Sequence, residues 1–302
     1  MTRRAARVSD AERGIISVAD RRRPSVRVGL TAVQALILVG LVISGLGPLL
    51  WLVKSAVSTT QDILREPFGL FPSGIVLWEN IPIAWEKARI GMFLGNTAII
   101  AIGSTIVTLL VCLTAAYVLS VLRPKWGPLL NGAIMATLFI PGVIALVPLY
   151  LTVLDLPILG ISLVNNYLAI WLPAGANAFL ILIVKRFFDA IPRELFEAAR
   201  IDGAGPVRVF LLIVLPLSRP IIGVVALLTF MASWKDFLWP LLVLPDPTLQ
   251  PISVALSKIA DTTPLNVQIA ALLLALLVPV TLFVVFQRQF LAGVGMAGGT
   301  KG

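Results

Sequence analysis

The residue types that carry most catalytic and metal chemistry are nearly missing from this chain. Its 302 residues include no histidine and one cysteine, Cys112. Histidine-based catalysis and metal binding are therefore excluded, and a disulfide within the chain cannot form. The sequence also lacks a Gly-x-x-x-x-Gly-Lys-Ser/Thr loop to hold nucleotide phosphates. We therefore assign no catalytic residue, no metal ligand and no cofactor to this chain, and we expect it not to be an enzyme.

Residues 185–220 form a polar segment with charged side chains that could bind a partner, and apolar runs lie on both sides of it. Glu194 and Glu197 precede Arg200 there, which is the charge order that the dipole of one helix favours. Gly203 is expected to end that helix in a left-handed turn. A helix of about ten residues is marginal in isolation and needs tertiary contacts. We therefore predict a short helix that docks onto another protein surface.

The rest of the chain is apolar enough to be a membrane protein. Hydrophobic residues make up 58%, charged residues 13%, and the mean hydropathy is +0.98, which is too apolar for an ordinary soluble domain. A transmembrane helix needs about 20 mostly apolar residues. Uncharged runs of that length are 29–53, 90–122, 126–154, 156–184 and 262–287, and a shorter run covers 220–234. We predict an all-α integral membrane protein with six transmembrane helices, and the predicted docking helix lies outside these spans.

Polar and helix-breaking residues inside these runs are the candidates for a translocation pathway. Prolines and glycines interrupt the third and fourth runs, and Asn177 lies among them. Lys235 and Asp236 end the fifth run, and charges in membrane segments often mark a pathway. The alternatives are that the breaks are packing kinks, that Lys235 reaches the lipid headgroups, and that Asp236 caps the next helix.

The placement of lysine and arginine predicts the orientation. Arginines crowd the first 27 residues, and further basic residues lie in 185–220 and near the end of the chain. The opposite side carries far fewer, so both termini are expected in the cytoplasm. The orientation then explains the excess of basic residues, and no nucleic-acid partner is expected. We divide the chain into a disordered basic cytoplasmic tail (1–27), a first transmembrane helix with an external segment (28–89), a transmembrane core (90–288) and a cytoplasmic C-terminal tail (289–302).

The external part of the second segment, residues 54–89, contains the helix-breaking sequence Pro67-Phe68-Gly69-Leu70-Phe71-Pro72. Two interpretations stay open for it. It is either an interfacial hairpin that rests on the outer headgroups or a surface for an external partner.

The polar segment also resembles a known family. Glu197-Ala198-Ala199, then Gly203, then Ile213-x-Leu215-Pro216 resembles the EAA loop of ATP-binding-cassette (ABC) importer permeases. Flanking residues are similar to the carbohydrate, maltose-type branch of these binding-protein-dependent transporters; they include Asn96, the Ala115-Ala116-Tyr117 and Pro148-Leu149-Tyr150 sequences, and the Trp234–Leu241 stretch. Lys235 departs from that branch, which commonly has asparagine there. The resemblance implies that the docking helix is a cytoplasmic coupling helix. The residues that it implies contact an ATPase subunit are Glu194, Glu197, Ala198, Ala199, Asp202 and Gly203.

The resemblance also implies function and partners. The expected function is the permease subunit of an ATP-driven importer for a sugar or sugar-like solute in the plasma (inner) membrane. Its expected partners are a second permease, two ABC ATPase subunits that use ATP and Mg, an extracellular solute-binding protein and the lipid bilayer. The alternatives are an importer of another solute, such as a polyamine, a peptide or a phosphorylated polyol, and a secondary transporter.

Overall fold

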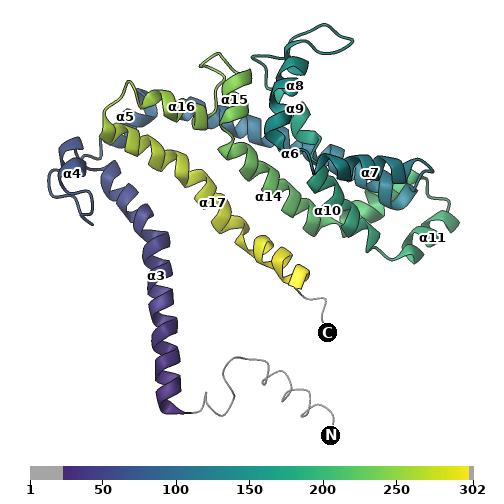
Figure 1. Cartoon of the computed structure of the whole chain (residues 1–302), viewed down its shortest axis with the longest axis horizontal. Helices are drawn as coiled ribbons and strands as arrows, with labels where there is room; N and C mark the ends of the chain where they lie inside the picture. The colour runs from purple at the N-terminus through teal and green to yellow at the C-terminus, as the bar shows by residue number, and fades with distance from the viewer. Residues whose placement is uncertain (1–22, 299–302) are drawn as a thin grey trace. The chain divides into compact units, whose positions relative to one another are not determined.

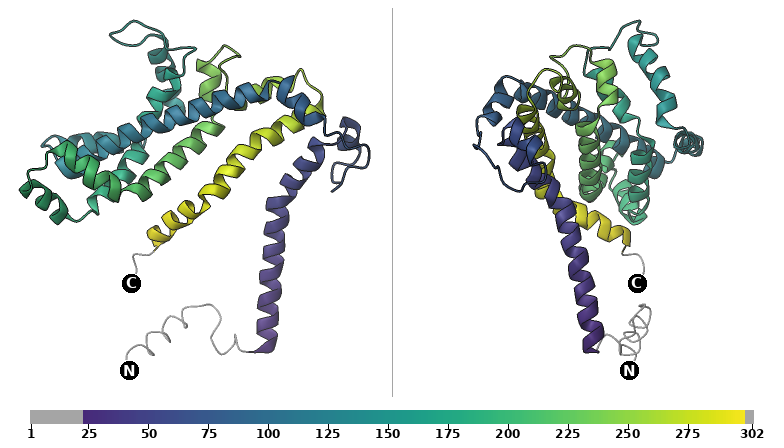
Figure 2. Two further views of the ribbon diagram at one scale, coloured as in Figure 1. Left: turned by 180° about the vertical axis from the view of Figure 1, so that it is seen from behind. Right: turned by 60° about the vertical axis from the view of Figure 1, so that its left-hand side comes forward.

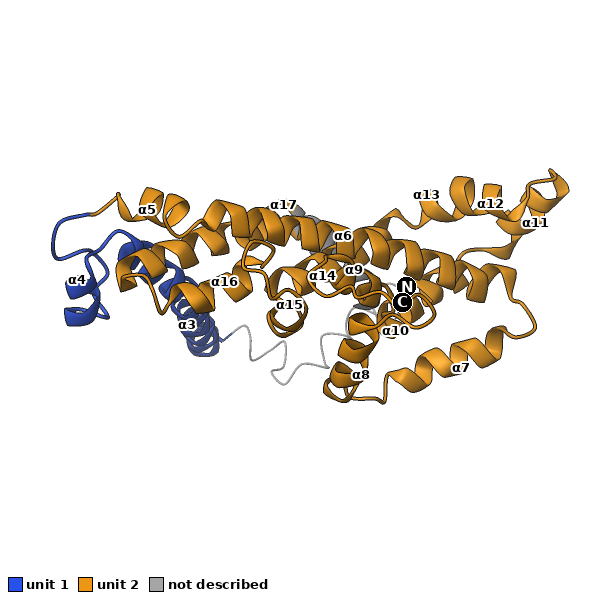
Figure 3. Ribbon diagram, turned by 90° about the horizontal axis from the view of Figure 1, so that it is seen from above, with its two compact units in different colours: residues 1–76 blue, residues 77–302 orange. Residues whose placement is uncertain are grey.

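The computed structural model of this chain describes residues 23–298, and helices and loops without any strand make up that range. The predicted all-α class is confirmed (Figure 1). The chain separates into two compact units, residues 1–76 and residues 77–302 (Figure 3).

The first unit contains one long apolar helix and one short helix. Helix α3 (Pro24–Ala56) has proline in its first turn, where the missing N–H costs nothing, and it includes the predicted span 29–53. Its 33 residues correspond to about 50 Å, more than the ~30 Å hydrocarbon core of a bilayer. Helix α4 (Thr60–Arg65) follows. Most of the predicted tail 1–27 lies outside the described residues; its last four residues begin α3.

The second unit is built around α6 (Ile90–Tyr117), which continues as a π-helical turn, η1 (Val118–Leu122). Helix α6 packs against α9, α10 and α14 (Figure 2). The α6 residues buried in this packing include Ala101, Ser104 and Thr108. Small side chains of this kind allow helices to approach closely in a membrane protein.

Three of the predicted spans are bent pairs of helices. Helices α7 (Gly127–Thr137) and α8 (Gly142–Leu154) meet at 109°, and α9 (Leu168–Gly175) and α10 (Ala178–Asp189) meet at 45°. The segment Pro206–Leu217 meets α14 (Arg219–Lys235) at 79°. With the three long apolar helices, these pairs give six spans if each pair is one span.

The helix of the fourth span begins later than the uncharged run 156–184. Residues 155–167 form turns and loop, and α9 begins only at Leu168. The chain reverses there through Gly160 at φ +61°, a conformation that favours glycine. An uncharged run was therefore longer than the helix it contains.

Short helices and the last long helix complete the unit. They are α5 (Asn80–Glu86), α15 (Leu238–Val243), α16 (Ile252–Ile259) and α17 (Leu265–Gly298). Helix α17 packs against α5 and α14, and it extends the predicted span 262–287 into the segment predicted as a C-terminal tail. The last four residues of the chain lie outside the described range.

Candidate functional site

The predicted docking helix is present as α11 (Arg193–Ile201). Pro192 stands at the position before its first residue, Glu194 lies in the first turn and Arg200 in the last, as the helix dipole favours. Gly203 has φ +75°, which confirms the predicted left-handed turn. The chain then turns into α12 (Pro206–Val209), the π-helical turn η2 (Phe210–Val214) and α13 (Leu215–Leu217).

Most of the residues predicted to contact an ATPase subunit lie on the surface of the chain. The exposed members of this set are Glu194, Glu197, Ala198, Asp202 and Gly203. Ala199 is 7% exposed and packs into the hydrophobic core instead. Ala199 therefore seats α11 on its own chain, whereas Ala198 is exposed. The carbonyl of Ala199 also accepts the N–H of Ala204 at 2.8 Å, which fixes the turn that follows.

A tyrosine at the end of α6 ties the next part of the polar segment to the core. The hydroxyl of Tyr117 donates to the carbonyl oxygen of Pro206 at 2.8 Å. Its ring contacts the ring of Phe210, with centroids 4.9 Å apart. The first turn of α12 and the start of η2 are therefore both attached to the end of α6. Tyr117 stands out in the sequence only as part of the family resemblance, which assigns it no role.

A second joint, which sequence reasoning missed, centres on Asp189 at the end of α10. Its Oδ1 accepts the hydroxyl of Ser120 at 2.7 Å, and its Oδ2 accepts Nζ of Lys185 at 2.8 Å. Arg123 lies 3.5 Å from the same carboxylate and donates from Nε to the carbonyl of Ser120 at 2.7 Å. The joint therefore binds the end of η1 to the start of the connection that leads to α11. The only sequence signal was the i,i+4 spacing of Lys185 and Asp189.

A small cleft lies between this joint and α11. Its lining comes from η1, the end of α10 and α11, and includes Ser120, Arg123, Asp189, Phe196, Glu197 and Arg200. The candidate docking residue Glu197 and the joint at Asp189 thus border one space.

The three candidate pathway residues lie at helix ends. Asn177 precedes α10, and its side-chain oxygen accepts the N–H of Leu180 at 3.0 Å. Asp236 is the residue that follows the last turn of α14, two positions before α15 begins at Leu238, and among the described residues no side-chain hydrogen bond caps α15. Lys235 is exposed and forms no ion pair within residues 23–298. Across the same residues, no hydrogen bond or ion pair joins Asn177 to Lys235 or Asp236.

The loop at residues 245–251 is fixed to the opposite end of α6. Nδ2 of Asn96 donates to the carbonyls of Thr248 at 2.7 Å and Gln250 at 3.0 Å. Gln250 is 1% exposed, and its Oε1 accepts Nζ of Lys258 at 3.0 Å. Hydrogen bonds from the backbone and hydroxyl of Thr248 hold the pKa of Asp246 below its ordinary value, so this loop presents a negative charge at neutral pH.

Apolar helices in this arrangement, with a polar helix exposed at one end, define a multi-span membrane protein. Residues 113–295 match the family of binding-protein-dependent transport system inner membrane components. The chain belongs to this family, which confirms the resemblance read from the EAA residues and places the protein in the inner membrane as a multi-pass permease.

Curated relatives match over most of their length. The sn-glycerol-3-phosphate transport system permease protein UgpE of Agrobacterium fabrum is 29% identical over 90% of this chain and 96% of the relative. The lactose transport system permease protein LacG of Rhizobium radiobacter is 30% identical over 84% of this chain and 90% of the relative. UgpE of Yersinia enterocolitica is 31% identical over 80% of this chain and 87% of the relative.

A solved structure shares the fold. It is described as a bacterial ABC transporter involved in the import of the acidic polysaccharide alginate. The match has a TM-score of 0.77, covers 92% of this chain and 99% of that one, and has 19% sequence identity.

Proposed function

We propose that this chain is one of two permease subunits of an ATP-driven importer for a sugar or sugar-like solute. A second permease, two ATPase subunits that use ATP and Mg, and an extracellular solute-binding protein would complete the complex. Both termini would lie in the cytoplasm, which the distribution of lysine and arginine favours. The proposal is carried by the structure of α11. Its Glu194 and Glu197 are exposed, while the helix itself packs on the core through Ala199.

The ATPase subunit is expected to dock on α11 and the turn after it. Glu194, Glu197 and Asp202 supply exposed acids, Ala198 allows close approach, and Gly203 makes the turn. Ala199 would support the docking surface indirectly, because it packs α11 against the hydrophobic core. Movement of the docked subunit would reach the spans through the joints at Tyr117 and Asp189. Alternating access then requires two packings of the spans that expose the pathway to opposite sides.

The solute class is inferred from the relatives. Their names refer to lactose and to sn-glycerol 3-phosphate, a sugar and a phosphorylated polyol. Lactose supports the expected sugar, and sn-glycerol 3-phosphate is an example of the phosphorylated polyol that the sequence left as an alternative; both are small polyhydroxy compounds.

The test is purification of the tagged full chain from its native membrane, followed by reconstitution of the recovered complex into liposomes. We expect a second permease and an ATPase subunit to copurify, and a polyhydroxy solute to enter only when its binding protein and ATP are both present. Recovery of the chain without an ATPase subunit, or ATP-independent uptake driven by an ion gradient, would contradict the proposal.

An acidic sugar-like solute is the second candidate, and Lys235 favours it. The ammonium group is exposed at the end of α14 and lacks an acidic partner within residues 23–298. A cation beside a pathway would attract an anionic solute.

Lys235→Asn tests this second candidate. Uptake of an anionic solute such as sn-glycerol 3-phosphate should fall by about tenfold if one charge-assisted contact worth about 1.5 kcal/mol is lost. Uptake of neutral lactose should not fall. Lys125→Asn changes an exposed lysine elsewhere and serves as the control. If Lys235→Asn takes up each solute as well as the starting protein does, Lys235 does not line the pathway.

A further inference from the structure

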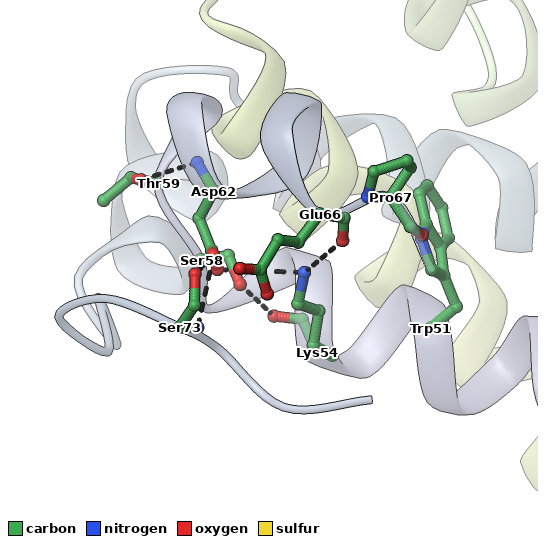
Figure 4. A network of polar contacts seen from close by, with 8 residues as sticks. All are labelled: Trp51, Lys54, Ser58, Thr59, Asp62, Glu66, Pro67 and Ser73. Atoms are coloured by element: carbon green, nitrogen blue, oxygen red, sulfur yellow. Dashed lines mark hydrogen bonds and ion pairs between the residues drawn. The ribbon is translucent and has the colours of Figure 1, made fainter. Parts of the chain in front are cut away.

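The C-terminal end of α3 carries a network of polar contacts that folds the following chain back onto the helix (Figure 4). Lys54 is 4% exposed; its Nζ lies 3.7 Å from Oδ2 of Asp62 and donates to the carbonyl of Glu66 at 3.2 Å. Ser58 donates to the carbonyl of Lys54 at 2.8 Å. Both charges of this buried pair are therefore partnered inside the unit, and neither is presented to a partner.

Asp62 extends the same network to the loop beyond α4. Its Oδ1 accepts the N–H of Ser73 at 3.2 Å and also the Ser73 hydroxyl. These hydrogen bonds hold the pKa of Asp62 below its ordinary value, although burial acts in the opposite direction. The carboxylate stays charged at neutral pH, and residue 73 stays fixed to α4.

Trp51 determines where along α3 the loop lies, and therefore the depth of the loop in the bilayer. Its Nε1 donates to the carbonyl oxygen of Pro67 at 2.6 Å. Trp51 lies two residues before Val53, where the uncharged run 29–53 ends. The hydrogen bond therefore holds Pro67 beside the last turn of the stretch that crosses the bilayer. Tryptophan is enriched at this depth in membrane proteins, with its ring in the headgroup layer.

The loop held at this level exposes large apolar side chains and carries no charge. Residues 67–76 contain no Asp, Glu, Lys or Arg. Phe68 is 94% exposed, Phe71 80% and Ile75 78%. A contiguous apolar surface of this kind usually marks a membrane or protein contact. The level fixed by Trp51 and the lack of charge both favour lipid over a water-soluble partner.

We propose that residues 67–75 form an interfacial anchor whose Phe68, Leu70 and Phe71 enter the boundary between headgroups and acyl chains at the C-terminal end of α3. The polar network holds the loop folded back, and the bilayer covers its apolar surface. The proposal concerns this unit alone and does not depend on which solute is carried.

Quenching of a fluorophore in the reconstituted full-chain complex tests the anchor. An NBD label is attached through Phe71→Cys in a Cys112→Ser background, in liposomes of phosphatidylethanolamine and phosphatidylglycerol. We expect blue-shifted emission that shallow doxyl-labelled lipid quenches and aqueous iodide does not. The matched control is Pro247→Cys, an exposed position in the loop 245–251 of the other unit, where iodide should quench and the lipid quencher should not.

Trp51→Phe, added to the labelled Phe71→Cys chain, tests the hydrogen bond that sets the level. It keeps an aromatic ring but removes the N–H donor, so the label should move toward the aqueous quencher. Quenching at position 71 by iodide to the same extent as at position 247 would overturn the proposal. Quenching by neither reagent would also overturn it, because a protein surface would then cover the loop.

Discussion

Single residues set how closely the helices of the second unit pack, and Gly103 shows this most directly. A methyl group added at Gly103 would overlap the indole ring of Trp171 on α9. Trp171 donates from Nε1 to the carbonyl of Ile100 at 3.2 Å, so the ring is held against α6 and cannot move aside freely. The absence of a side chain at Gly103 therefore allows α6 and α9 to meet.

Gly103→Ala should destabilise the protein by about 1–3 kcal/mol, the usual cost of overpacking a close helix contact. The measurement is the thermal midpoint of the detergent-solubilised complex, followed by fluorescence-detected size exclusion. Gly95→Ala on the same helix is the control, because a methyl group there meets no atom within 4 Å. Equal midpoints for the two variants would show that the Trp171 contact is loose.

Gly203 and Gly205 form a matched pair for testing the turn after α11. Added methyl groups meet nothing within 4 Å at either position, but Gly203 has φ +75° and Gly205 has φ −71°. Gly203→Ala should therefore strain the turn by about 1–2 kcal/mol, whereas Gly205→Ala should not.

The expected result for Gly203→Ala is a normal amount of protein in the membrane, with transport and solute-stimulated ATP hydrolysis falling together. Both activities are measured in liposomes beside Gly205→Ala. Unchanged transport in Gly203→Ala would show that α11 does not transmit ATPase movement.

At the level of elements, apolar runs and helix signals were enough to predict most of the helices. The run 29–53, the docking helix with its charge order, and the stop at Gly203 all follow from local sequence. The uncharged run 156–184 did not mark where the helix of the fourth span begins, because loop residues 156–167 are as uncharged as the helix they precede. Hydrophobicity alone does not separate a membrane helix from an apolar turn.

The parts of the candidate site that sequence reasoning missed depend on contacts between distant elements. Ser120 and Asp189 are 69 residues apart, and Tyr117 and Pro206 are 89 apart. No local periodicity indicates such pairs. The burial of Ala199 was missed for the same reason, since which face of a short helix meets the core depends on how the whole segment is seated.

The joint at Asp189 predicts a measurable coupling between η1 and α10. Asp189→Ala would leave the hydroxyl of Ser120, a residue only 4% exposed, without its acceptor, at a cost of about 1–3 kcal/mol. The ion pair with Arg123 adds less, because Arg123 is half exposed and surface pairs contribute about 0–1 kcal/mol. Stability should fall modestly, and solute transported per ATP hydrolysed should fall as well.

A double-mutant cycle with Ser120→Ala separates this joint from general damage. The combined loss in Asp189→Ala/Ser120→Ala should be smaller than the sum of the single losses, because both variants remove the same hydrogen bond. Asp155→Ala, an exposed aspartate in the loop after α8, is the control. Additive losses would show that Ser120 and Asp189 act independently.

At the scale of the whole molecule, the two ends of the second unit are chemically different, and the proposed orientation assigns them to opposite sides of the membrane. Asn96, near the first residue of α6, binds the loop 245–251, while Tyr117, its last residue, binds the segment that begins at Pro206. These contacts lie about 20 residues apart along one helix, which corresponds to about 30 Å and matches the hydrocarbon thickness of a bilayer.

Labelling of single cysteines from one side of the membrane tests that assignment in a Cys112→Ser background. Ile201 at the end of α11 is 87% exposed, and Pro247 lies on the exposed loop at the other end. A membrane-impermeant maleimide added to intact cells should label Pro247→Cys and leave Ile201→Cys unlabelled, and disruption of the cells should make Ile201→Cys reactive. The reason is the excess of lysine and arginine in 185–220 over the loops on the other side. Labelling of Ile201→Cys in intact cells would invert the orientation and remove α11 from reach of a cytoplasmic ATPase.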